Sequence, residues 1–120
     1  MRWLGVAALC ADLILLPDTV SAQAEQDSAT WMLRGCRAAI YKVETHRMTG
    51  DESFLAGICH GVVRAVLIVD DETCAPNKST QGQAVRLVVQ YIEARPSRQH
   101  ESFVQLAIEA LRAAWPCRRT

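Results

Sequence analysis

Apolar residues recur at steps of three and four along four stretches of the chain, which is the spacing of one face of an α-helix. These stretches cover about 27–47, 52–70, 81–94 and a final stretch that starts at Pro96-Ser97. The β-branched run within 52–70 would also fit a buried strand, but its length and continuing period favour a helix. Short connections between four such helices predict an all-α fold, a small antiparallel four-helix domain.

The predicted core consists of one apolar stripe from each helix. Thr80 and Gln83 form a predicted capping box before the third helix, because each side chain can satisfy the other residue's free backbone N–H. In chain order, the stripes are Met32, Cys36, Ala39, Ile40 and Val43; Leu55, Ile58, Cys59, Val62, Val66 and Val69; Ala84, Val88, Tyr91 and Ile92; and Phe103, Ala107, Ala110, Leu111 and Ala114.

Residues 1–24 have the layout of a cleaved secretory signal peptide. A basic start at Arg2 precedes an apolar run that is too short to span a membrane, and the segment closes on Ala22-Gln23-Ala24. Asp12 interrupts the apolar run, so a buried N-terminal helix of a cytosolic domain is the alternative. We expect cleavage after Ala24, with Ala22 as the second choice. Cleavage after Ala24 leaves residues 25–120 as a single periplasmic domain without a stable membrane anchor.

Cleavage also changes the number of cysteines from odd to even, since Cys10 is lost with the signal peptide. Four cysteines in a small exported domain predict two disulfides, with three pairings open by number alone. If consecutive helices form antiparallel hairpins, Cys36 and Cys59 face each other, and the end of the chain returns to Cys74. We therefore expect the disulfides Cys36–Cys59 and Cys74–Cys117.

Charge and residue spacing argue against several classes of function. The chain has 13 Lys+Arg and 13 Asp+Glu, which gives no reason to expect nucleic acid as a partner. Cys59-His60 is an adjacent thiol–imidazole pair, but consecutive helix residues do not face each other, and a disulfide would consume the thiol. The pair also lacks the first cysteine of a haem attachment signature. His46 and His100 lie in other segments, so we expect no catalytic residues, no metal and no cofactor.

The four cysteines and the residues near them form a sequence pattern that covers nearly all of the mature chain. The pattern is Cys36, Gly57-x-Cys59-x-Gly61, Cys74-x-Pro76-x-x-x-Thr80-x-x-Gln83, Val89-x-Tyr91-Ile92, Pro96, Ala107-x-x-Ala110-Leu111 and Ala114-Trp115-Pro116-Cys117. It resembles the Rap/Tai family, the periplasmic immunity proteins of type VI secretion amidase effectors. After Gly61, that family usually has an aromatic residue and then a further glycine, where this chain has Val62 and Ala65.

The resemblance implies a small exported helical protein that acts by binding, without catalysis. Its partner would be a peptidoglycan amidase effector whose active site it occludes, and it would often form a homodimer. The four cysteines carry over as structural positions. A periplasmic helical stress chaperone or envelope-assembly binding protein is the alternative, and it would bind many clients weakly rather than one enzyme tightly.

The loop between the second and third helices is the candidate partner-binding segment, because an inhibitor of an enzyme groove needs an exposed, rigid protrusion. Asp70, Asp71 and Glu72 could steer it toward a basic groove, and Asn77 and Lys78 follow on the loop. The acids also sit at a helix C-terminus, where the helix dipole disfavours them. A solvated helix end with an ordinary loop is the alternative.

Overall fold

The computed structural model describes residues 24–118, and this part of the chain is helical, without a β-strand. Residues 1–23 of the predicted signal peptide lie outside the described residues. The helices are α2 (Ala29–Tyr41), α3 (Gly50–Val69), α4 (Gln81–Glu93) and α5 (Phe103–Ala114), with short 3-10 turns at Val43–Thr45 and Pro96–Arg98. The predicted all-α class with two disulfides is confirmed.

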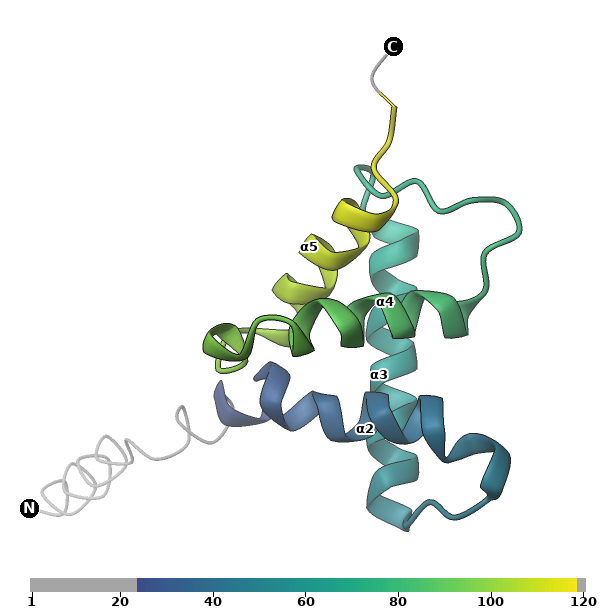
Figure 1. The fold of residues 1–120 in the computed structure, drawn as a ribbon, viewed down its shortest axis with the longest axis vertical. Helices are drawn as coiled ribbons and strands as arrows, with labels where there is room; N and C mark the ends of the chain where they lie inside the picture. Colours follow the sequence, from purple (N-terminus) through teal and green to yellow (C-terminus); the bar gives the residue numbers. More distant parts are fainter. Residues whose placement is uncertain (1–23, 119–120) are drawn as a thin grey trace, which may run out of the picture.

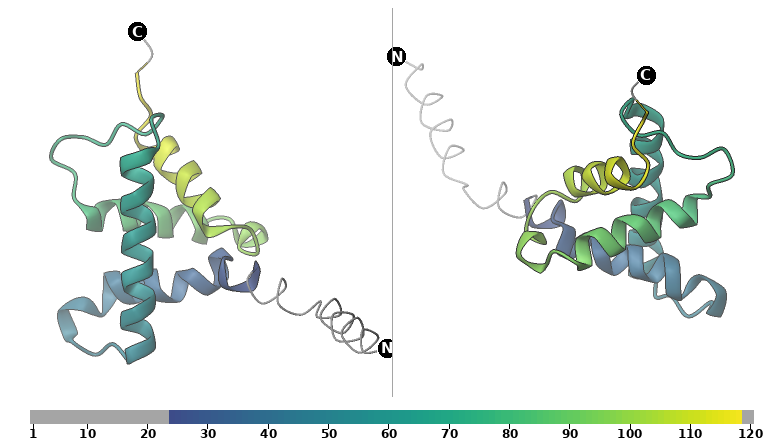
Figure 2. Two further views of the ribbon diagram at one scale, coloured as in Figure 1. Left: turned by 180° about the vertical axis from the view of Figure 1, so that it is seen from behind. Right: turned by 45° about the horizontal axis from the view of Figure 1, so that its top comes forward.

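The helices are arranged around a crossing (Figure 1). α2 and α4 lie side by side and run in opposite directions, while α3 crosses both of them steeply. α5 packs obliquely against α3 and α4, and the 74–80 loop arches away from the helices, as the views of Figure 2 also show. Consecutive helices are neighbours as the hairpins predict, but α3 runs across its partners rather than along them.

A glycine allows α2 and α3 to cross at very short range. A Cβ atom built on Gly35 would lie 2.4 Å from the carbonyl carbon of Leu55, so no other residue fits without separating the helices. Directly beside this contact, Cys36 and Cys59 form a disulfide with a Cα–Cα distance of 5.4 Å. Both cysteines are fully buried. The crossing is therefore fixed by backbone proximity and by a covalent bond at the same point.

Capping boxes define where the two central helices begin. The box predicted from Thr80 and Gln83 is present, with N–H to side-chain oxygen distances of 2.9 and 3.2 Å. A second box, formed by Thr49 and Glu52, begins α3 and was missed in the sequence, although its Thr-x-x-Glu spacing is the usual signal. Lys42 Nζ also lies 2.6 Å from Glu52, which ties the end of α2 to the start of α3.

Two helix boundaries differ from the sequence expectation. The first helix ends at Tyr41 rather than near residue 47, because a 3-10 turn follows and His46 then adopts a left-handed conformation with φ 49°. The last helix begins at Phe103 rather than at residue 97. The reason is that the intervening segment provides the carbonyl oxygens of Gln99 and Glu101, which accept hydrogen bonds of 2.9 Å from the free N–H groups of the first turn of α2.

The buried face of α3 is rotated relative to the predicted stripe. Val63 is fully buried, whereas Val69, a predicted core residue, is 76% exposed. Successive side chains of a helix are rotated by about 100° about its axis. The predicted stripe therefore lies along the boundary between the buried face and an uncovered apolar face of the same helix. The stripe predictions are also wrong for Val43 and Ala114, which are exposed. The largest fully buried side chains are Phe103, Leu33, Leu55, Ile92, Leu106 and Leu111.

Replacing Gly35 with alanine should test the crossing. We expect G35A to lower the free energy of unfolding by about 3 kcal/mol, because the added methyl group meets the backbone of Leu55 rather than a movable side chain. Gly82→Ala is the matched control: its nearest neighbour to an added Cβ is 3.9 Å away, and we expect it to stabilise α4 by about 0.5 kcal/mol. Urea denaturation measures both, and equal effects would contradict the role given to Gly35.

Candidate functional site

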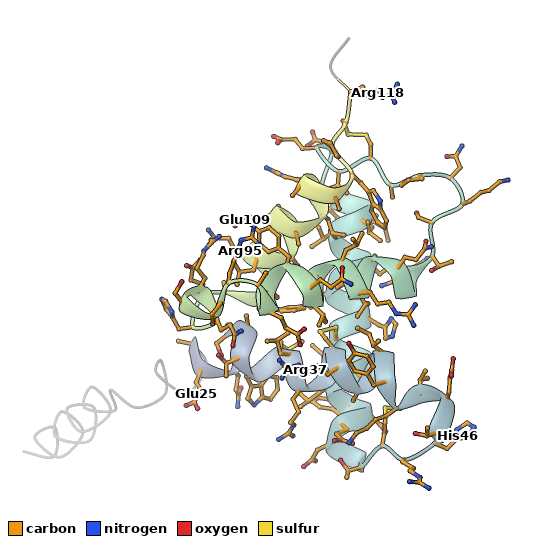
Figure 3. The ribbon with its side chains drawn as sticks, viewed as in Figure 1. Glu25, Arg37, His46, Arg95, Glu109 and Arg118 are labelled. Carbon is orange, nitrogen blue, oxygen red and sulfur yellow. A yellow bond between two sulfur atoms is a disulfide. The ribbon has the colours of Figure 1, made fainter. Side chains whose placement is uncertain are left out.

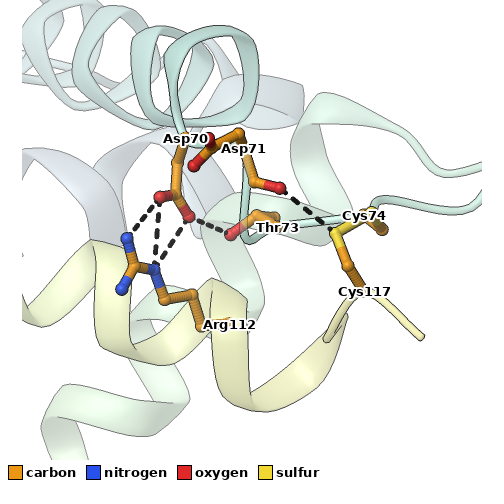
Figure 4. Close-up of a disulfide and its surroundings, with 6 residues drawn as sticks. All are labelled: Asp70, Asp71, Thr73, Cys74, Arg112 and Cys117. Carbon is orange, nitrogen blue, oxygen red and sulfur yellow. Dashed lines mark hydrogen bonds and ion pairs between the residues drawn. A yellow bond between two sulfur atoms is a disulfide. The ribbon is translucent and has the colours of Figure 1, made fainter. Parts of the chain in front are cut away.

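The base of the predicted binding loop is fastened to the end of the chain. Cys74 and Cys117 form a disulfide with a Cα–Cα distance of 4.9 Å, which is the pairing expected from the sequence. Next to it, the N–H of Cys74 donates a 2.8 Å hydrogen bond to the carbonyl oxygen of Trp115, and Thr73 pairs with Pro116 in an isolated antiparallel bridge. Figure 4 shows this corner of the molecule. The loop therefore starts from a fixed point.

An ion pair reinforces the corner (Figure 4). Arg112 of α5 donates to both carboxylate oxygens of Asp70, with Nε distances of 3.2 and 3.0 Å and an Nη2 distance of 2.5 Å. The hydroxyl of Thr73 donates to the same carboxylate at 2.6 Å, and the Asp70 side chain is only 6% exposed. The hydrogen bonds from Arg112, and then from Thr73, lower the pKa of Asp70 to about 2. The carboxylate is thus held in its charged form by α5.

The structure assigns different surroundings to the three predicted acids. Asp70 is committed to the internal ion pair, whereas Glu72 is 60% exposed and reaches Arg112 Nη1 at 3.0 Å. Asp71 is exposed, and its carbonyl oxygen lies 3.4 Å from Cys117 Sγ, a contact without a hydrogen bond because a disulfide sulfur carries no proton. Asp71 and Glu72 are consequently the acidic side chains that a partner could reach.

Arg112 is the residue of this corner that the sequence analysis missed. It lies 42 positions from Asp70, on another helix, and a single cation on a helix surface gives no signal of its partner. Asn77 and Lys78, the other predicted site residues, are exposed on the loop. The structure brings them near the start of α4 rather than to the ion pair.

A groove runs between the loop and α4. Its volume is about 530 Å³. Within the loop wall, Ser79 is held in a tight turn, since its N–H and hydroxyl both donate to the carbonyl oxygen of Pro76 at 2.9 and 2.7 Å. The groove is lined by Pro76, Lys78, Ser79, Gln83, Arg86, Leu87, Gln90 and Trp115.

A second accessible surface is the uncovered apolar face of α3. Phe54, Ile68 and Val69 are 67%, 70% and 76% exposed, and the glycines between them, Gly57 and Gly61, have open space where a Cβ would stand. Of the described residues, those of α3 form the single helix long and apolar enough to cross a membrane. These properties also fit a core helix with one uncovered side, because α3 packs on α2, α4 and α5.

A polar network between α4, α5 and the segment that joins them has a structural role. Arg98 bridges Glu101 and Glu109, with distances of 2.8 and 2.7 Å, and the hydroxyl of Tyr91 donates to Glu109 at 3.0 Å. Arg95 stacks 3.6 Å above the Tyr91 ring, and Figure 3 shows Arg95 and Glu109 on adjoining elements. These groups satisfy one another and hold the 96–102 segment on α4 and α5. Among the described residues, no group of three or more His, Cys, Asp or Glu could hold a metal ion.

The ion pairs predict how stability depends on pH. The folded protein lowers the pKa of Asp70 and of Glu109 to about 2, from ordinary values of 3.8 and 4.5. A lowered folded-state pKa stabilises the protein above the unfolded pKa, and this contribution is lost as the pH falls toward the folded value. We expect the free energy of unfolding to fall between about pH 4.5 and about pH 2.

Urea titrations at a series of pH values measure this slope. Asp70→Asn should make it shallower because the titrating carboxylate is gone, and Glu72→Gln, which removes an exposed carboxylate facing the same arginine, serves as the control. An unchanged slope in D70N would contradict the assignment.

The comparison with known proteins agrees with the disulfides and helices described above. The family model for Rap1a immunity proteins matches residues 28–117, which includes all four paired cysteines and every helix described here. Neither the curated proteins nor the solved structures contain a significant match to the chain. The match covers far more than half of the sequence, and the chain therefore belongs to the Rap1a immunity protein family.

Proposed function

We propose that this immunity protein binds a peptidoglycan amidase effector of type VI secretion in the periplasm and inhibits it by occluding its active site, without catalysis. Membership of the family makes it an immunity protein against a secreted effector. The amidase, the mode of inhibition and the compartment are the finer parts of the proposal. The amidase rests on the resemblance of the sequence to the Rap/Tai family, the mode of inhibition on the fixed loop base, and the compartment on the disulfides.

Occlusion is supported by the fixed loop base. The disulfide, the bidentate ion pair of Asp70 with Arg112 and the Cys74–Trp115 hydrogen bond hold one end, and the Thr80 capping box begins α4 at the other end. A protrusion ordered before binding loses little conformational entropy on entering a groove. This preorganisation is the observation that carries the proposal.

Export is supported by the two disulfides, because such bonds form and persist in oxidising compartments. It agrees with the expected cleavage after Ala24 and with a mature domain of residues 25–120. In the chain-entropy account, closing loops of these lengths stabilises the domain by about 3–4 kcal/mol each. A small domain gains a large share of its stability from such bonds.

The uncovered face of α3 supports a homodimer as a further part of the proposal. Large apolar side chains gathered on one helix face mark an interaction surface in most soluble proteins. In a dimer with a two-fold axis, the same surface of both chains is buried, so the α3 face of one chain would pack on the α3 face of the other. The same face is also the observation that favours the alternative function, a periplasmic chaperone, since such a protein presents apolar surface to unfolded clients.

Capture of the partner tests the main proposal. Purified protein, immobilised and incubated with lysate of cells that carry an active type VI system, should retain one dominant protein at near-stoichiometric yield. That partner should cleave peptide bonds in isolated peptidoglycan and lose this activity on addition of one equivalent of the immunity protein. A partner without amidase activity would contradict the proposal, and a broad set of clients at low yield would support the chaperone.

The accessible acids can then be tested against that partner. We expect the double variant D71K/E72K to lower the association rate by about tenfold at low salt, because opposite charges on the two surfaces steer the encounter. E25K/E44K makes the same change of charge at exposed positions far from the loop and should bind as the wild type does. Surface plasmon resonance measures the rates, and equal effects of the two variants would exclude these acids as the steering surface.

The oligomeric state tests the α3 face. We expect sedimentation velocity to show a dimer for the wild type and a monomer for F54S/I68S, because these side chains are among the most exposed apolar groups of the described residues. Y41S changes an aromatic residue of α2 that is as exposed as Phe54 but lies beside α4, and it should leave the mass unchanged. A monomeric wild type at micromolar concentration would contradict this part of the proposal.

A further inference from the structure

The groove beside the loop has two cations on its rim and no carboxylate in its lining. Lys78 and Arg86 form no ion pair with any described residue, whereas Arg37, Lys42 and Arg112 each contact a carboxylate within 3.0 Å. Nearby acids are absent from the groove because Asp70 and Glu72 turn toward Arg112 on α5. The groove therefore presents positive charge that the described part of the domain leaves uncompensated.

The remaining walls offer amide and apolar contacts. Gln83 and Gln90 add side-chain amides, and the oxygen of Gln83 is already used as an acceptor by the Thr80 N–H. Trp115 and Leu87 are half-buried and give the groove an apolar part. Cations and amide donors around an apolar patch are suited to carboxylate side chains that flank an apolar one.

We propose that this groove binds an acidic segment of the partner protein, with carboxylates at Lys78 and Arg86 and an apolar side chain against Trp115. The inference rests on the proposed docking of this end of the molecule to an effector. It adds which charges of the effector face each side of the loop. The accessible acids Asp71 and Glu72 lie on the α5 side of Cys74, and the two cations lie on the α4 side.

A surface with acids on one side and cations on the other fits a partner in one orientation. The partner should present a basic patch to Asp71 and Glu72 and an acidic segment to the groove. The reversed orientation places like charges against each other on both sides, which costs several kcal/mol and excludes it. The charge pattern therefore sets the direction in which the loop enters the effector.

Two short peptides test the groove without the effector. One blocked pentapeptide has a leucine between two pairs of glutamates, and the other has lysines in place of the glutamates. The isotope-labelled domain of residues 25–120 has two tryptophans, Trp31 and Trp115. The titration follows the indole N–H signal of Trp115, which is the one that remains in the W31F variant. We expect the acidic peptide to shift this signal with a millimolar Kd and the basic peptide to leave it unchanged.

Charge variants show whether the rim is responsible. K78E/R86E and the milder K78Q/R86Q should weaken the acidic peptide by about tenfold or more, which corresponds to about 1.4 kcal/mol. R47E/R64E changes the charge equally at exposed cations outside the groove and should stay within about twofold, because salt at 0.15 M screens distant charges. Thermal melting confirms that each variant is folded.

Three results of the peptide titrations would overturn the inference: no shift of the Trp115 signal at about 10 mM acidic peptide, an equal shift with the basic peptide, or equal weakening by the groove and control variants. The peptide titration is independent of the capture experiment. If the captured partner is not an amidase while the acidic peptide still binds, the proposed function fails and the groove assignment stands. If the K78E/R86E variant binds and inhibits the amidase with the affinity of the wild type, the groove assignment fails and the proposed function stands.

Discussion

The fold depends on the close contact between α2 and α3. At Gly35 the two backbones approach so nearly that a single methyl group would separate them, and the Cys36–Cys59 bond holds the same point covalently. α3 crosses its neighbours rather than following them, and it packs on α2, α4 and α5. It also leaves one apolar side uncovered. The core face and the uncovered apolar face are therefore two sides of one helix, and both are set by one crossing.

The second disulfide works in a different setting. Cys36 and Cys59 are buried in the core, whereas Cys74 and Cys117 lie near the surface at the base of a loop. Two non-covalent contacts beside the second bond also join the loop base to the end of the chain. They are the ion pair between the nearly buried Asp70 and Arg112, and the hydrogen bond from the Cys74 N–H to the Trp115 carbonyl oxygen. The first bond holds the domain together, and the second holds a shape that the domain presents to its surroundings.

The sequence predicted the elements and the cysteine pairs because these depend on local patterns. Apolar periodicity, the Thr80 capping box and the hairpin order all act over a few residues or between consecutive helices. It could not predict the rotation of α3, since Val63 and Val69 are equally apolar and the neighbouring helices decide which of them is covered. The partner of Asp70 was hidden for the same reason: Arg112 is distant in sequence, and a lone surface arginine resembles any other.

The first turn of α2 has a consequence for the order of folding. Its free N–H groups donate to carbonyl oxygens at Gln99 and Glu101, and the hydroxyl of Thr30 reaches Gln99 across 69 positions of sequence. An early helix completed by such late residues cannot form its final contacts until almost the entire chain is present. Completion of α2 therefore waits for residues near the C-terminus, and contacts so distant in sequence form slowly. The hydrogen bonds that close the domain thus also delay its closure until the chain is nearly complete.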